Sequence, residues 1–261
     1  MFRLTRQVRF AVNATADEQL SARPANRYAG YPSLTGLGHF FALSVTVRGE
    51  VDLATSYLIN IRRIDETVRA LVIPLVCRRI ESDRFAGGGE VLLDIFASLH
   101  AALDEISLDS VAINLSPFLS LSCFASEHPM IRLSQKFEFS ASHRLHSPDL
   151  SDDENRRRFG KCNNPNGHGH NYELQVTLRG EPDANGRITD IPRFERVVAD
   201  TVVERFDHKN LNVEVPEFRD VIPTVENIAR TIHGLLKSKL GASLASVTVW
   251  ETPKTWCEYS E

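Results

Sequence analysis

The chain repeats itself, and this repeat constrains its possible folds more than any other feature of the sequence. Residues 36–50 and residues 167–181 align without a gap, and nine of the 15 positions are identical. The order of the predicted elements repeats as well. Each half continues with two apolar helical stripes and ends in a short apolar strand, Val111–Ile113 in the first half and Val247–Trp250 in the second. The sequence therefore predicts two similar modules in tandem.

Each module has the pattern strand, strand, helix, helix, strand or strands, which is an α+β pattern built on antiparallel hairpins. The strand that follows His170 alternates, so that its apolar side chains share one face: Tyr172, Leu174, Val176 and Leu178. The segment Ala125–Pro129 is typical of a linker. We therefore expect a first module over residues 1–124, a linker over 125–134 and a second module over 135–261.

The composition argues against several classes of protein. The 261 residues are 42% hydrophobic and 25% charged, as in ordinary soluble globular proteins. A formal net charge of −4 and a pI near 6.2 argue against nucleic acid as the main partner, because phosphate backbones require clustered Lys and Arg. No apolar run approaches the roughly 18 residues of a membrane span, and the N-terminus lacks a secretory signal pattern. Four cysteines do not resemble a disulfide framework, so we expect a cytoplasmic protein with free thiols.

Three histidines at predicted strand ends form the main candidate site. His168 and His170 are two residues apart and therefore share the apolar face of their strand. His143 ends a second alternating run and points inward in the same way. If the two strands pair as a hairpin, three imidazoles converge on one ion, and three protein ligands with an open fourth position are typical of catalytic zinc. The alternative is that each histidine is a hydrogen-bonded core or loop residue, but the convergence of three favours a metal site.

A thiol and an acid–histidine pair could supply proton transfer beside such a metal. Cys162 precedes the two histidines, and a thiol near bound zinc would be a usable base or nucleophile, although it could be a plain loop cysteine. Asp207 and His208 follow a predicted helix. The acid could fix the tautomer of the histidine, which could then exchange protons with the thiol. A solvated helix end is the alternative interpretation of this pair.

Polar residues near the last helix and the last apolar strand could bind a substrate. Thr224 is a natural N-cap and Glu226 suits the first helical turn, and these structural roles need no ligand. Glu251 follows the strand Val247–Trp250, where its carboxylate could accept paired N–H donors from a pterin or guanine ring. Without a ligand it would be an exposed charge at the end of a strand.

The first module lacks these residues at the corresponding positions. Leu37 replaces His168, and only His39 remains, at the position of His170. Three further positions also differ: Asn13 lies about where His143 would fall, Tyr31 about where Cys162 would, and Leu115 replaces Glu251. Since one histidine cannot hold a catalytic zinc, we expect the first module to be a scaffold that kept the fold and lost the site.

The second half of the chain resembles the 6-pyruvoyltetrahydropterin synthase family. The matching runs are Phe139–Leu145, Phe159–Tyr172, Asp207–Leu211, Thr224–Asn227 and Glu251–Thr252. The resemblance implies the tunnelling fold (T-fold), a four-stranded antiparallel sheet with two helices on one face, here present twice. It also implies assembly through sheet edges into barrels with active sites at subunit interfaces, so we expect a homo-oligomer, a trimer or a hexamer.

The resemblance also implies roles for individual residues. His143, His168 and His170 would bind Zn²⁺. Cys162 would be the base that moves side-chain protons of the substrate, with Asp207 and His208 as its partners, and Glu251 would anchor the pterin ring with help from Thr224 and Glu226. The substrate would be 7,8-dihydroneopterin triphosphate, and the enzyme would be a lyase of tetrahydrobiopterin biosynthesis that releases triphosphate.

Two other functions stay open. The first is 6-carboxytetrahydropterin synthase, which has the same fold and substrate but cleaves off part of the side chain on the route to deazapurines. The five residues between Cys162 and His168 resemble the spacing in the pyruvoyl-forming enzymes and favour that product. The second is a non-catalytic pterin-binding module with a structural zinc, and the presence of Cys162, Asp207 and His208 together argues against it.

Overall fold

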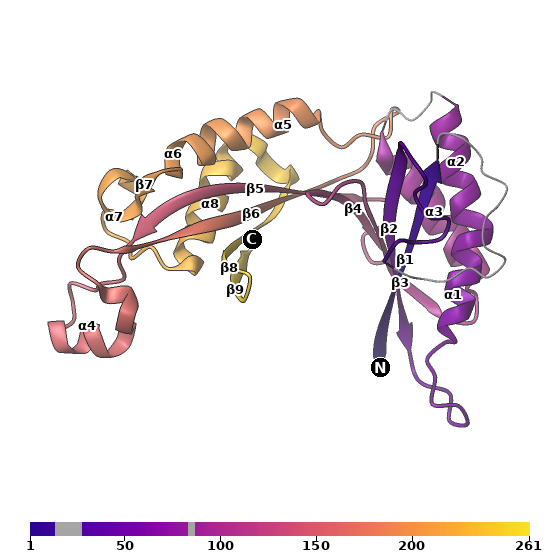
Figure 1. Cartoon of the computed structure of the whole chain (residues 1–261), viewed down its shortest axis with the longest axis horizontal. Coiled ribbons are helices and arrows are strands. Elements are labelled where there is room, and N and C mark those ends of the chain that lie inside the picture. The colour runs from indigo at the N-terminus through magenta and orange to yellow at the C-terminus, as the bar shows by residue number, and fades with distance from the viewer. Residues whose placement is uncertain (14–27, 83–86) are drawn as a thin grey trace. The chain divides into compact units, whose positions relative to one another are not determined.

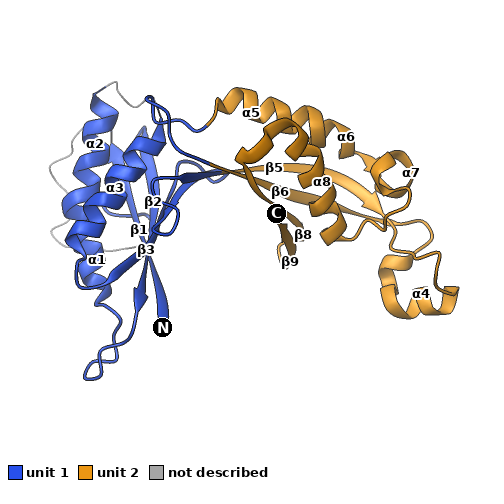
Figure 2. Ribbon diagram, turned by 180° about the vertical axis from the view of Figure 1, so that it is seen from behind, with its two compact units in different colours: residues 1–133, 180–188 blue, residues 134–179, 189–261 orange. Residues whose placement is uncertain are grey.

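The computed structural model describes residues 1–13, 28–82 and 87–261, which fall into two compact units (Figures 1 and 2). Unit 1 consists of Met1–Leu133 and Gly180–Ile188, and unit 2 of Ser134–Arg179 and Thr189–Glu261. Residues 14–27 and 83–86 of the predicted first module lie outside the described residues. None of the described helices has the length and apolar content that crossing a membrane requires.

Unit 1 is built on an antiparallel sheet with the strand order β1-β2-β3-β4, and helices cover one face of it (Figure 1). The strands are β1 (Phe2–Asn13), β2 (Gly38–Gly49), β3 (Ser107–Asn114) and β4 (Leu119–Phe124). The helices are α1 (Ile61–Thr67), a π-helical segment (Val68–Val72), α2 (Ile73–Glu81) and α3 (Gly88–Ala102). The alternation along β2 buries Phe41, Leu43, Val45 and Val47.

Unit 2 has the strand order β5-β6-β8-β9, and the two-residue strand β7 runs parallel to β5. The strands are β5 (Ile131–His143), whose first residues belong to unit 1, β6 (His168–Gly180), β7 (Lys209–Asn210), β8 (Leu244–Thr252) and β9 (Thr255–Tyr259). The helices are α4 (Asp152–Phe159), α5 (Ile191–Val198), a π-helical segment (Ala199–Val203), α6 (Glu204–Phe206), α7 (Leu211–Glu214) and α8 (Val225–Leu240). Three short 3₁₀ turns complete the unit: Gly160–Asn163, Pro216–Phe218 and Gly241–Ser243. The α+β class is confirmed, and β7 is an addition to the predicted elements.

The core of unit 2 comes from the predicted alternation. Tyr172, Leu174 and Val176 of β6 are fully buried, as are Phe194 of α5 and Ile232 of α8. Because the histidines continue this face of the hairpin, the apolar core ends directly at the polar cluster described below.

Irregular features of the two units repeat together with the regular ones. Each unit has a π-helical segment inside its first long helix, and each has a register shift within the strand of the aligned motif, at Thr46/Val47 and at Thr177/Leu178. Both pairs of features are separated by the same number of positions as the aligned sequence segments. Since π-helical segments and β-bulges are rare local insertions, their coincidence is what two copies of one module would produce.

Candidate metal centre and active site

The hairpin of β5 and β6 brings the three predicted histidines together at one end of unit 2. The Nε2 atoms of His143 and His168 are 3.1 Å apart, and the His168 and His170 rings lie 4.9 Å apart between centroids. Glu251, at the end of the neighbouring strand β8, places Oε1 3.2 Å from Nε2 of His143 and 3.3 Å from Nε2 of His170. The ligand atoms of these four residues all lie within 4.8 Å of one another.

The protonation of the cluster suits a cation. The fully buried His143 donates its Nδ1 proton to the carbonyl of Pro223 at 2.7 Å, because a carbonyl can only accept. Its Nε2 therefore faces the cluster, and a partner that fixes a ring in this way is typical of metal-binding histidines. Burial, together with the neighbouring imidazoles, lowers the pKa of His168, and burial also lowers the pKa of His170. Neutral rings with facing lone pairs require a proton or a cation between them.

Three of the spacings within the cluster match those of ligands around a tetrahedral ion. Zinc–nitrogen bonds of roughly 2.0–2.1 Å in tetrahedral geometry place neighbouring ligand atoms about 3.3 Å apart. The contacts that join His143 to His168, His143 to Glu251 and His170 to Glu251 are 3.1, 3.2 and 3.3 Å. Elsewhere in the described ranges, no other group of three or more His, Cys, Asp or Glu side chains converges in this way.

The Cys162 turn lies between α4 and β6, a few residues before the histidines of β6. The Tyr172 hydroxyl is 3.4 Å from both ring nitrogens of His143. Burial raises the pKa of Tyr172, and the charge of the nearby Glu251 carboxylate raises it further. Cys162 is half-buried in the 3₁₀ turn after α4, and its carbonyl accepts a hydrogen bond from the backbone N–H of Leu145 at 2.9 Å.

Asp207 and His208 form the predicted acid–histidine pair at the edge of β5. Asp207 Oδ1 accepts from the backbone N–H of Ser140 at 2.7 Å, and Oδ2 accepts from Nδ1 of His208 at 2.7 Å. The Ser140 bond and then the His208 bond hold the pKa of Asp207 below its usual range. His208 has a φ of +56°, a conformation that residues other than glycine adopt mainly at special sites, and its N–H donates to the Ser140 carbonyl at 2.6 Å. Its Nε2 has no hydrogen-bond partner among the residues that the structure describes and is available for proton exchange.

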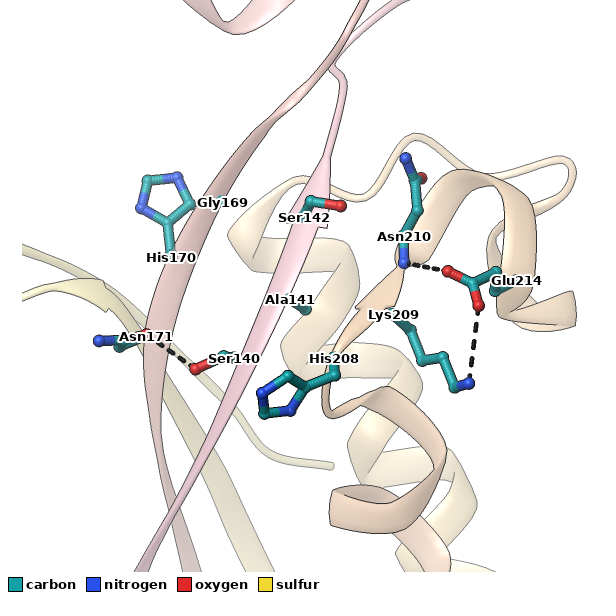
Figure 3. Close-up of a pocket in the computed structure, with 10 residues that line it drawn as sticks. All are labelled: Ser140, Ala141, Ser142, Gly169, His170, Asn171, His208, Lys209, Asn210 and Glu214. Carbon is teal, nitrogen blue, oxygen red and sulfur yellow. Dashed lines mark hydrogen bonds and ion pairs between the residues drawn. The ribbon is translucent and has the colours of Figure 1, made fainter.

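A cavity of about 500 Å³ beside the hairpin is lined by His208, by Ser140 and Asn171, and by His170 of the cluster (Figure 3). Ser140 Oγ donates to Asn171 Oδ1 at 2.7 Å on this face, and both residues alternate with the inward-facing positions of their strands. The His208 side chain is 83% exposed. Across the described residues, no hydrogen bond or ion pair connects Cys162 with Asp207 or His208. One chain therefore brings the three histidines and Glu251 together, while the acid–histidine pair lies at the edge of β5, next to β7.

The two residues at the start of α8 have different surroundings. Thr224 Oγ1 accepts from the backbone N–H of Asn227 at 3.3 Å, so the predicted N-cap is confirmed. Glu226 is exposed in the first turn, with no hydrogen bond or ion pair to any residue that the structure describes. Pro223, directly before this helix, is the carbonyl partner of His143. This contact could not be predicted from the sequence, because any backbone carbonyl can serve as such a partner.

Unit 1 has no such site among its described residues. His39 is exposed and its ring contacts Phe41, and Leu37 is 95% exposed. The Asn13 side chain forms hydrogen bonds with the backbone of residues 33 and 35. It donates to the Ser33 carbonyl at 3.0 Å and accepts from the N–H of Thr35 at 3.0 Å.

Comparisons with known proteins agree with this geometry. A family model described as 6-pyruvoyl tetrahydropterin synthase matches residues 132–261. The human 6-pyruvoyl tetrahydrobiopterin synthase is 46% identical over 123 residues, which cover 46% of this chain and 85% of the human protein. The 6-carboxy-5,6,7,8-tetrahydropterin synthase of Haemophilus influenzae is 29% identical over 51% of this chain and 100% of its own length. A uricase structure from Arthrobacter globiformis matches 100% of this chain and 93% of the uricase chain with a TM-score of 0.51 and 8% identity, which is a likeness of fold alone.

Proposed function

The chain belongs to the 6-pyruvoyl tetrahydropterin synthase family, and on this premise we propose that unit 2 is a zinc-dependent synthase that converts 7,8-dihydroneopterin triphosphate to 6-pyruvoyltetrahydropterin. This membership makes it an enzyme, a lyase. The observation that carries the zinc proposal is the convergence of His143, His168, His170 and Glu251 within 4.8 Å. The identity of 46% to a pyruvoyl-forming relative, against 29% to a carboxy-forming one, supports the pyruvoyl product.

The three imidazoles would hold the metal, with His143 oriented by the Pro223 carbonyl. When bound, zinc would supply Lewis-acid polarisation of the substrate's side-chain oxygens, which makes the neighbouring C–H bonds more acidic. Cys162 is the base that removes a side-chain proton, and its half-buried position in the turn before His168 and His170 supports this role. The substrate then loses triphosphate while its side chain is rearranged.

His208 acts as the second proton carrier through its free Nε2, while Asp207 fixes the tautomer and stabilises the imidazolium. Since no hydrogen bond or ion pair joins this pair to Cys162 within the described residues and His208 is 83% exposed, it serves an active site that a second chain completes. This arrangement agrees with the homo-oligomer that the family resemblance implies, with barrels closed through sheet edges.

The pterin ring is held by carboxylates near the start of α8 and the end of β8. Glu226 lacks a partner within the described residues and can accept two N–H donors of the ring, while Thr224 keeps its hydroxyl proton for donation. Glu251 is close to the histidines, so it can anchor the ring only if the ring lies beside the metal.

Unit 1 is a degenerate T-fold module that completes the assembly without chemistry of its own. The repeated bulge and π-helical segment support this interpretation, as does the fold likeness to uricase over the whole chain.

The direct test is to incubate the zinc-loaded protein with 7,8-dihydroneopterin triphosphate and to identify the products by mass spectrometry. We expect 6-pyruvoyltetrahydropterin and inorganic triphosphate. A 6-carboxy product with acetaldehyde would assign the chain to the deazapurine route instead. Tight pterin binding without consumption of the substrate would identify a non-catalytic binding module.

A further inference from the structure

We propose that a second cavity of unit 2, between the Cys162 loop and the segment before α8, is an anion subsite that receives the triphosphate tail of the substrate. Its volume is about 520 Å³, and its lining includes Arg144, His146, Arg219, Gly167 and Ile222. This inference rests on the proposed function for the identity of the ligand, but the cationic character of the cavity follows from the structure itself.

Arg144 is held in place while the end of its side chain stays available. Its backbone N–H donates to Asn212 Oδ1 at 2.7 Å, and Asn212 Nδ2 donates to its carbonyl at 3.0 Å. Its Nε donates to the Asn163 carbonyl at 3.1 Å. The two terminal nitrogens of this half-buried guanidinium have no hydrogen-bond partner among the described residues, and no described carboxylate lies within ion-pair distance. A fixed guanidinium with two free N–H₂ groups matches the paired oxygens of a phosphate.

Two further groups make the cavity a donor site. Asn163 Nδ2 lies 3.1 Å from Nδ1 of His146, and because an amide nitrogen only donates, the neutral His146 carries its proton on Nε2. Arg219 is exposed, and its side chain has no partner among the residues that the structure describes. Asp220 is the sole carboxylate in the lining. The lining therefore contains two guanidinium groups and one carboxylate, so the net charge of the lining side chains is positive.

The cavity is placed where the tail of the substrate would extend. Gly167 directly precedes His168, and Ile222 directly precedes Pro223, whose carbonyl binds His143. The buried Asn163 also ties Arg144 to the loop of the proposed base, since it follows Cys162 in the same 3₁₀ turn. A pterin side chain at the metal cluster would therefore have its phosphates within reach of Arg144.

The cavity beside His208 fits an anion less well. Its single lysine, Lys209, already pairs with Glu214 at 3.6 Å, and Asp207 is adjacent to His208. The positive charge there is compensated by carboxylates of the same chain, whereas that of Arg144 is not.

The test measures binding of inorganic tripolyphosphate to the zinc-loaded full-length protein by titration calorimetry. The variants are Arg144→Gln, Arg144→Lys and Arg219→Gln, with Arg193→Gln as the matched control, because Arg193 is exposed on α5 and does not line the cavity. We expect the two glutamine variants in the cavity to bind about 10- to 100-fold more weakly, as expected for loss of a charged hydrogen bond. The lysine variant should recover part of the loss, and the control should match the unchanged protein.

Exposed Arg219 can be replaced without disturbing packing, so its variant reports on binding even if an Arg144 variant fails to fold. Equal tripolyphosphate affinity in Arg219→Gln, Arg193→Gln and the unchanged protein would overturn the proposal. The Michaelis constant for 7,8-dihydroneopterin triphosphate separates the two proposals. Turnover with an unchanged Michaelis constant in both glutamine variants would refute the subsite and leave the synthase function intact. Arginine-dependent tripolyphosphate binding without any turnover would refute the function and leave the subsite.

Discussion

Replacement of a single histidine should weaken zinc binding only when the histidine belongs to unit 2 and not when it is the equivalent residue of unit 1. His170 and His39 occupy equivalent positions of the repeat, yet only His170 joins the cluster with His143 and Glu251. We expect about one zinc per chain for the unchanged protein and for His39→Ala, and a large loss for His170→Ala. The pair is a matched control, because both substitutions remove the same side chain from the same point of the same motif.

The size of the effect follows from the number of ligands. Structural zinc sites with four protein ligands have apparent binding free energies of about 10–16 kcal/mol, or about 3 kcal/mol per ligand. Loss of one of the three proposed histidine ligands should therefore weaken zinc binding about 100-fold. With free zinc at about 1,000 times the dissociation constant of the unchanged protein, binding stabilises the fold by about 4.1 kcal/mol. A 100-fold weaker site would retain about 1.4 kcal/mol of this stabilisation at the same zinc concentration.

The assay combines metal analysis after gel filtration with thermal unfolding at a buffered zinc concentration. His170→Ala should lose most of its zinc and most of the zinc-dependent rise in Tm, while His39→Ala should keep both. Near two zinc per chain in the unchanged protein, or equal losses in the two variants, would refute the assignment of the site to unit 2 alone.

Further predictions concern chemistry and pH. Cys162→Ala should abolish turnover and leave zinc content and pterin binding intact, and activity equal to the unchanged protein would rule out the thiol as base. Asp207→Asn should keep the Ser140 N–H bond but lower turnover by about 100-fold, measured by product formation, because the histidine loses its acceptor. Glu226→Gln should raise the Michaelis constant for the pterin without loss of zinc, which metal analysis would check. In the metal-free protein, folding lowers the pKa values of His168 and His170. Below about pH 6.5 the unfolded chain therefore binds more protons at these two residues than the folded chain does. The free energy of unfolding should therefore fall from pH 7.5 to 5.5, and urea titrations should show a smaller fall in a variant with asparagine at both positions.

The metal cluster could be predicted from sequence because it depends on strand alternation alone. His143, His168 and His170 each continue an apolar face, and once β5 and β6 pair, their convergence follows from geometry. Glu251 joins them because β8 pairs with β6, and its closeness to the histidines could not be deduced from its own neighbours in the sequence.

Other features depend on contacts between distant segments and carry no local signal. The hydrogen bond from His143 to Pro223 joins residues 80 positions apart. Strand β7 has two residues, too few for any periodicity, yet it places His208 beside β5. Asn163 looks like an ordinary loop asparagine, but it is buried and connects Arg144, Leu145 and His146 to the Cys162 turn.

The edge of the first strand in each unit explains how one copy could lose its chemistry and keep its fold. The hydroxyl pairs Thr5–Thr46 at 2.8 Å and Ser134–Thr177 at 3.0 Å mark the same point of the two hairpins. Ala11 and Ser140 lie equally far beyond Thr5 and Ser134, so their backbone N–H groups hold corresponding places. The N–H of Ser140 donates to the Asp207 carboxylate at 2.7 Å, whereas the N–H of Ala11 donates to the Pro32 carbonyl at 2.8 Å. The fold requires only an acceptor for this donor, and a backbone carbonyl meets that requirement as well as a carboxylate does. Proton transfer through a neighbouring histidine requires the carboxylate, so replacing it removes chemistry from unit 1 without leaving its strand edge unsatisfied.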